Sequence, residues 1–228
     1  MQLSGKQNHK LHWRLSLADI FQMFSKVFYK SKIEDLDYGK IINMIDSIEY
    51  HKNDVVNDLS VPNINDASID KKLLNKPEFK FLKDRIVNEF YKFKNEYLRY
   101  ENNHFKMTTS WVSKTPKGKS SNMHNHNNCV YSGILYLNVN ENSGNISFED
   151  MSNKRFRIIP VEYNHLNSTE IRFSPEIGTI IFFPSEIHHK VMDNNSDIIR
   201  YSLAFNFMPE GEIGFENGDS YVNMRIID

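Results

Sequence analysis

The sequence predicts a mainly β fold, a jelly roll of two packed sheets, with helices of the N-terminal half flanking one face. Apolar residues recur every three or four positions in the first hundred residues, and from about Phe105 they alternate. Aromatic residues make up 13% of the chain and only 9 of the 228 residues are glycine, which is typical of a packed, β-rich globular protein. This length fits one integrated domain, in which a helical part (1–104) packs on a β core (105–228).

Two segments of the N-terminal half have the period of an amphipathic helix. In residues 38–50 the apolar positions are Ile41, Ile45 and Ile48, which share one helical face. In residues 84–99 the same spacing joins Ile86, Phe90, Phe93 and Tyr97. The segment 53–77 between them is polar and holds Pro62 and Pro77, so we expect an irregular connection there.

The C-terminal half contains short segments rich in β-branched and aromatic residues, separated by Gly, Pro, Asn and Ser. Such a series, without helical patterns in between, is typical of a sandwich or double-sheet jelly roll. The predicted strands are 105–113, 130–139, 144–149, 170–173, 178–184 and 200–208.

Composition excludes several classes of function. The 28 basic and 29 acidic side chains give a net charge of −1, which disfavours nucleic acid and anionic membranes as partners. No apolar run approaches the roughly 18–20 residues of a membrane span, and the polar N-terminus does not have the pattern of a signal peptide. The single cysteine, Cys129, excludes an internal disulfide and fits a reducing cytoplasm, so we expect a cytoplasmic protein.

Histidines are concentrated in the β half. His124 and His126 are two residues apart, so on a strand both side chains would point the same way and could share one metal ion. A second pair, His188 and His189, follows the apolar strand 178–184, and His189 could meet the first two across the interior of a jelly roll. We expect His188 to be the solvated neighbour of a ligand. The alternative is that 122–128 forms a polar surface loop with two incidental histidines.

The strand 200–208 has two different faces. Its aromatic face suits contact with the helical half, which leaves Arg200 and Ser202 pointing toward the histidines. A buried guanidinium requires an anion, and its planar fork suits a carboxylate. That carboxylate could belong to a small molecule or to a protein acid such as Asp197, and the spacing favours neither.

Four motifs stand in order between residues 124 and 206. They are His124-x-His126, the segment 132–138, the segment 178–191 with His188 and His189, and Arg200-x-Ser202-x-x-Phe-Asn206. Together they resemble the iron(II)- and 2-oxoglutarate-dependent oxygenases, in particular a branch related to prolyl 4-hydroxylase-like enzymes that is common in marine bacteria and their phages. The resemblance is strongest over 107–208, and it implies a double-stranded β-helix, a cupin-like jelly roll.

The resemblance also implies a cofactor set and roles for individual residues. By position, His124, His126 and His189 would bind Fe(II). Arg200, Ser202 and Tyr136 would hold the distal carboxylate of the co-substrate 2-oxoglutarate. With O2, such an enzyme decarboxylates 2-oxoglutarate to succinate and CO2 and oxidises a substrate, most commonly by hydroxylation.

One position departs from the family pattern. His126 stands where most of the superfamily has Asp or Glu, and three neutral imidazoles would leave Fe(II) with two positive charges instead of one. An alternative is that Glu149 or Asp150, on the next predicted strand, contributes a carboxylate.

Two other functions compete with this one. The first is a three-histidine cupin-like metalloenzyme that does not use 2-oxoglutarate, in which an inward Arg200 would have no purpose. The second is a non-catalytic jelly-roll binding protein, which would require the histidines and Arg200 to be exposed or far apart. The resemblance leaves the oligomeric state and the oxidised substrate open: a protein residue, a free amino acid, a nucleobase or a small metabolite.

Overall fold

The computed structural model describes residues 25–51, 65–100, 104–151, 158–164 and 166–227. A large antiparallel sheet has the strand order β1-β8-β5-β10-β4-β3-β2, with β11 paired to β10, and a second sheet has the order β7-β6-β9. The strands are β1 (Tyr29–Lys32), β2 (Tyr50–His51), β3 (Asp66–Ser68), β4 (His104–Thr115), β5 (Tyr131–Asn138), β6 (Ile146–Glu149), β7 (Glu170–Phe173), β8 (Thr179–Pro184), β9 (His188–Val191), β10 (Arg200–Ile213) and β11 (Val222–Met224).

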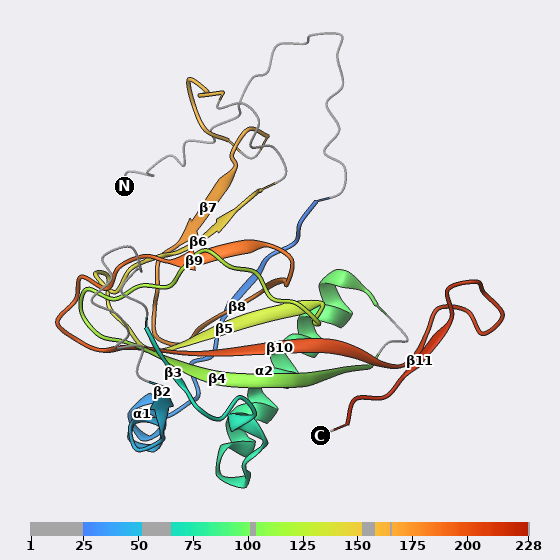
Figure 1. The fold of residues 1–228 in the computed structure, drawn as a ribbon, viewed down its shortest axis with the longest axis horizontal. Helices are drawn as coiled ribbons and strands as arrows, with labels where there is room; N and C mark the ends of the chain where they lie inside the picture. Colours follow the sequence, from blue (N-terminus) through green and yellow to red (C-terminus); the bar gives the residue numbers. More distant parts are fainter. Residues whose placement is uncertain (1–24, 52–64, 101–103, 152–157, 165, 228) are drawn as a thin grey trace, which may run out of the picture.

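The helices lie on one face of the large sheet and the small sheet lies on the other (Figure 1). They are α1 (Tyr38–Asp46) and α2 (Lys80–Lys92), with short 3₁₀ turns at Leu73–Asn75 and Pro77–Phe79 and a π-helical turn at Phe93–Leu98. This is the mainly β double-sheet architecture that the alternating segments predicted. Among the described residues, no helix is long and apolar enough to cross a membrane.

Two hydrophobic cores separate these layers. The larger core joins the helices to the outer face of the large sheet, and Phe90 of α2 stacks on Phe207 of β10 with ring centroids 4.0 Å apart. The smaller core lies between the two sheets and contains Ile134, Tyr136 and Phe183. The aromatic face of β10 therefore packs on the helices, as predicted, and its other face looks into the space between the sheets.

The structure differs from the sequence prediction mainly at element ends and at edges. The first helix ends at Asp46, four residues early, because Tyr50 begins the edge strand β2. The strands β1, β2, β3, β9 and β11 were not predicted, since such short strands without an apolar alternation leave no period to detect. Of the predicted connection 53–77, residues 53–64 lie outside the described residues.

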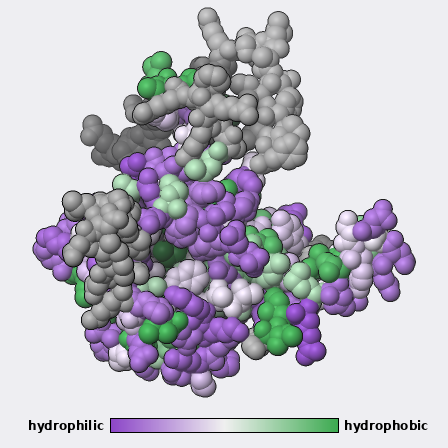
Figure 2. Space-filling view, in the orientation of Figure 1, coloured by the Kyte–Doolittle hydropathy of each residue, from purple (hydrophilic) through white to green (hydrophobic). Residues whose placement is uncertain are grey.

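The surface is mostly hydrophilic in the view of Figure 2, with apolar side chains in smaller patches. The β10–β11 hairpin projects from the body of the protein as an arm (Figure 1). The interior between the sheets, rather than this surface, contains the predicted site residues.

Candidate metal and co-substrate site

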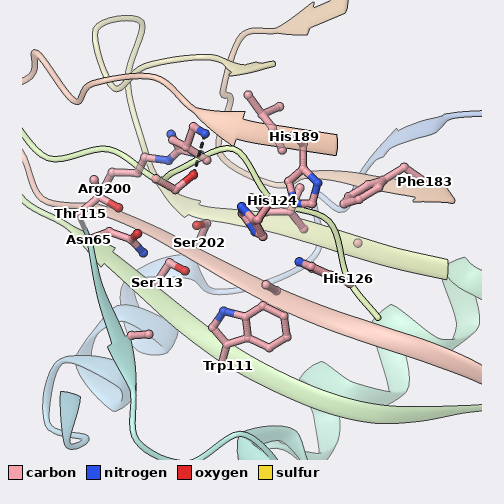
Figure 3. Close-up of a pocket in the computed structure, with 17 residues that line it drawn as sticks. Asn65, Trp111, Ser113, Thr115, His124, His126, Phe183, His189, Arg200 and Ser202 are labelled. Atoms are coloured by element: carbon pink, nitrogen blue, oxygen red, sulfur yellow. Dashed lines mark hydrogen bonds between the residues drawn. The ribbon is translucent and has the colours of Figure 1, made fainter. Parts of the chain in front are cut away.

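The three predicted histidine ligands converge between the sheets (Figure 3). His124 forms an antiparallel bridge with His189, with hydrogen bonds of 2.9 and 2.8 Å between their backbones. His126 lies beside them, and one potential ligand atom from each residue lies within 4.8 Å of the others. The histidines thus belong to one cluster rather than to an incidental surface loop.

Each imidazole is oriented by a hydrogen bond at Nδ1. The partner of His124 is the backbone carbonyl of Asn122 at 2.8 Å, and that of His189 is the carbonyl of Ile187 at 3.0 Å. Because a carbonyl only accepts, Nδ1 carries the hydrogen in both rings and Nε2 keeps a free lone pair. This is the tautomer in which Nε2 can bind a metal ion.

Burial keeps the imidazoles of His189 and His126 neutral. It lowers the pKa of His189 to about 3, with a further contribution from the neighbouring His124. Burial also lowers the pKa of His126. Neutral imidazoles have the lone pair that metal binding requires, and they suit Fe, Zn, Cu and Ni. The donor set therefore fits the iron that the motifs implied.

The acidic alternatives lie apart from this cluster. Glu149 pairs with Lys190 at 3.0 Å, and within the described residues neither it nor Asp150 belongs to a group of potential metal ligands. His188 is half-buried and faces Glu149 in the β6–β9 register. The carboxylate of Glu149, which was considered as a substitute ligand, is thus paired with Lys190.

Arg200 lines the same cavity and is only 1% exposed. Its Nη1 donates to the carbonyls of Ser143 and Gly144 at 3.3 and 3.1 Å. Its Nε and Nη2 have no hydrogen-bond partner among the described residues. Asp197, the protein acid considered as its partner, pairs instead with Lys117 at 2.6 Å. The guanidinium therefore presents two parallel donors, the fork that binds a carboxylate side-on.

Tyr136 and Ser202 lie close to Arg200. Tyr136 is fully buried, its ring centroid is 5.3 Å from the Arg200 guanidinium carbon, and its hydroxyl has no partner within the described part of the chain. Burial raises the pKa of Tyr136, so its hydroxyl stays protonated and able to donate. Ser202 lies opposite Tyr136 in the β10–β5 register and lines the cavity. Three groups that the motifs assigned to one carboxylate thus gather at one place.

The cavity has a volume of about 240 Å3 and includes residues that sequence reasoning missed. Trp111 and Ser113 of β4 and Asn65, next to β3, line its other side (Figure 3). The Trp111 ring centroid is 5.5 Å from that of His126. The alternation that placed Arg200 inward could also have found Trp111 and Ser113, because they oppose Ala204 and Ser202 on the neighbouring strand.

Replacing Gly144 with alanine is expected to disturb the Arg200 anchor. Gly144 has a φ of +78°, and an added Cβ would lie 2.4 Å from the carbonyl oxygen of Met192. We expect a loss of about 1–3 kcal/mol in the free energy of unfolding, measured in urea, together with weaker 2-oxoglutarate binding, because a carbonyl that holds Nη1 must move.

Gly118→Ala is the matched control for this substitution. Gly118 has nearly the same φ, +77°, and no atom of the described residues lies within 4 Å of the added Cβ. The Gly118→Ala variant should lose only the stability that the strained backbone costs, and it should keep its affinity for 2-oxoglutarate. Equal affinities in the two variants would show that the turn does not position Arg200.

The comparisons with known proteins concern the β half of the chain and its fold. Residues 109–206 match the family described as putative 2OG-Fe(II) oxygenase. No curated protein matches the sequence. Among solved structures, a Pseudomonas putida prolyl-4-hydroxylase is 16% identical with a TM-score of 0.54, covering 81% of this chain and 93% of that one.

Two further structures have the same fold. A Trichoplax adhaerens prolyl hydroxylase, in complex with a hypoxia inducible factor peptide fragment, is 17% identical with a TM-score of 0.55, over 79% of this chain and 83% of that one. HygX from Streptomyces hygroscopicus, with nickel, 2-oxoglutarate and hygromycin B bound, is 12% identical with a TM-score of 0.54, over 80% and 82%. The matched family segment runs from β4 to β10 and contains the three converging histidines, Tyr136, Arg200 and Ser202. Over these residues the chain is similar to the 2OG-Fe(II) oxygenases, the non-haem iron enzymes that use 2-oxoglutarate and O2.

Proposed function

We propose that His124, His126 and His189 bind Fe(II) through Nε2, and that Arg200, Ser202 and Tyr136 bind the distal carboxylate of 2-oxoglutarate. The enzyme would couple decarboxylation of 2-oxoglutarate to the hydroxylation of a second substrate. The observation that carries this proposal concerns Nε and Nη2 of Arg200, which have no hydrogen-bond partner among the described residues. Arg200 lines the cavity where the three imidazoles converge.

The residues of the chain have separate tasks in this reaction. Bound Fe(II) and 2-oxoglutarate would supply O2 activation, with release of succinate and CO2. Arg200 would neutralise the distal carboxylate, while Tyr136 and Ser202 donate hydrogen bonds to it. The apolar wall of Ile134, Ile146, Phe183 and Val191 would exclude water from the reacting groups. The neutral imidazoles would leave the metal with its full double positive charge.

The cavity also restricts the substrate. Apart from Arg200, the described lining residues bear no Asp, Glu, Lys or Arg side chain. Since Arg200 would be neutralised by 2-oxoglutarate, we infer that the substrate group that enters is uncharged. Succinate formation with amidated and free-acid forms of the same candidate substrate tests this inference. Faster turnover of the free acid would contradict it.

Anaerobic titration with Fe(II) and then 2-oxoglutarate tests the proposed function. We expect the weak visible absorption band that the metal and the co-substrate give together. Iron binding without this band would favour the three-histidine enzyme that does not use 2-oxoglutarate. Absence of iron binding would show that the histidine cluster is structural and the proposal wrong.

The substitution His126→Asp tests the departure from the usual ligand. A carboxylate at this position would keep one metal-binding atom and add a negative charge, so we expect Fe(II) affinity within about tenfold of the parent. Anaerobic Fe(II) titration gives the affinity, and His126→Ala serves as the variant without a ligand. If His126→Asp loses iron as completely as His126→Ala, the third imidazole is required.

A further inference from the structure

His126 differs from the other two histidines in what holds its Nδ1. Its Nδ1 lies within hydrogen-bond distance of two side-chain atoms, Oδ1 of Asn206 and Oγ of Ser132, each at 2.8 Å. A hydroxyl can donate or accept, and the amide of Asn206 can present either its oxygen or its nitrogen. Unlike the backbone carbonyls beside His124 and His189, these partners do not dictate the tautomer by their chemistry alone.

A chain of hydrogen bonds joins these side chains across three adjacent strands. Asn206 lies opposite Ser132 of β5 and Thr109 of β4 in the sheet register. Its Oδ1 accepts from Ser132 Oγ at 2.7 Å, and its Nδ2 donates to Thr109 Oγ1 at 2.9 Å. Ser132 also contacts the Ser185 hydroxyl at 2.8 Å. The amide is therefore fixed in place by the sheet, with a partner for each end.

The donors and acceptors of this hydrogen-bond network can be arranged in two consistent ways, which differ in the orientation of the Asn206 amide. With Oδ1 toward His126, Nδ1 must carry the hydrogen, and the Nε2 lone pair is free for a metal. With the amide reversed, Nδ2 would donate to Nδ1, the hydrogen would move to Nε2, and that nitrogen could not bind a metal. Because the hydroxyls of Thr109 and Ser132 adapt to either direction, the orientation of the Asn206 amide decides the tautomer.

We propose that Asn206 is a positioning residue, which holds His126 in the tautomer that directs the Nε2 lone pair to the metal. The proposal rests on the proposed function, since the benefit of this tautomer is metal binding. A carboxylate ligand has no tautomers and would not need the contact. An imidazole at position 126 does need it, and the three strands supply it through Asn206, Thr109 and Ser132.

Two substitutions of nearly equal shape test this role. Asn206→Leu removes the acceptor, while Asn206→Asp supplies an acceptor that cannot be reversed. Asn223→Asp, on the exposed strand β11, is the matched control for the added charge. Nitrogen-15 NMR of labelled histidine in the metal-free protein at pH 8 reports the His126 tautomer, and calorimetric titration with Ni(II) alone reports metal affinity.

We expect the parent and Asn206→Asp to show the Nδ1–H tautomer, with Ni(II) affinities within about threefold of each other. We expect Asn206→Leu to gain the Nε2–H tautomer and to bind Ni(II) at least about tenfold more weakly, the size typical of outer-shell changes. An unchanged tautomer in Asn206→Leu, or an equal loss of Ni(II) in Asn206→Asp, would overturn the proposal. A parent that binds no Ni(II) would contradict the proposed function instead, and the NMR result would still test the role of Asn206.

Discussion

Replacing His189 with alanine is expected to abolish tight Fe(II) binding. His189 is 4% exposed, lies 4.3 Å from His124 and 5.0 Å from His126 between ring centroids, and stays neutral because burial lowers its pKa to about 3. Two remaining imidazoles would bind iron weakly. The loss should exceed the roughly 10–100-fold that outer-shell changes cost, as measured by anaerobic Fe(II) titration.

His188→Ala is the matched control, because it removes the neighbouring imidazole from the same strand. His188 lies outside the histidine cluster, so this variant should bind Fe(II) as the parent does. Circular dichroism melting of the metal-free proteins separates metal loss from unfolding. If His189→Ala is folded and keeps its iron affinity, His189 is not a ligand.

Replacing Arg200 with methionine is expected to weaken 2-oxoglutarate binding strongly while leaving Fe(II) binding largely intact. Loss of a buried, charge-assisted pair costs on the order of 2–4 kcal/mol, which corresponds to roughly 30- to 1,000-fold in Kd. The metal-free protein should be as stable as the parent or more so, because the substitution removes a buried cation with two donors that have no partner in the described part of the chain. Calorimetric titration with 2-oxoglutarate and urea unfolding measure the two effects.

The control for this variant is Arg172→Met on β7. Arg172 is half-exposed and pairs with Glu170 at 2.6 Å, so its loss removes one positive charge without reaching the cavity. It should not alter the affinity for 2-oxoglutarate. Equal affinities of Arg200→Met and the parent would remove Arg200 from the co-substrate site.

Most strands of the β half could be predicted from the sequence because burial on one face imposes an alternation, although β9 and β11 were missed. The segment 170–173 matches β7, and β8 and β5 begin and end within one residue of the predicted 178–184 and 130–139. The edge strands of the sheets could not be predicted in this way. Strand β1 has the sequence Tyr-Lys-Ser-Lys, and only its pairing with β8 makes it a strand.

The candidate site shows the same division. The inward direction of Arg200 followed from the alternation of β10, and the contact of His189 with His124 was expected across the interior of the predicted jelly roll. The contribution of Asn65 could not be predicted, because it reaches the cavity from a polar connection without a period. The contact between Asn206 and His126 joins residues 80 positions apart, and only the sheet register brings them together.

A crystal structure of the protein with Ni(II) and 2-oxoglutarate tests the account most directly. The account predicts a metal ion about 2 Å from Nε2 of His124, His126 and His189. It also predicts a carboxylate of 2-oxoglutarate at about 2.7–2.9 Å from Nε and Nη2 of Arg200. A metal bound through Glu149 or through fewer than three of these histidines, or a 2-oxoglutarate carboxylate away from Arg200, would contradict it.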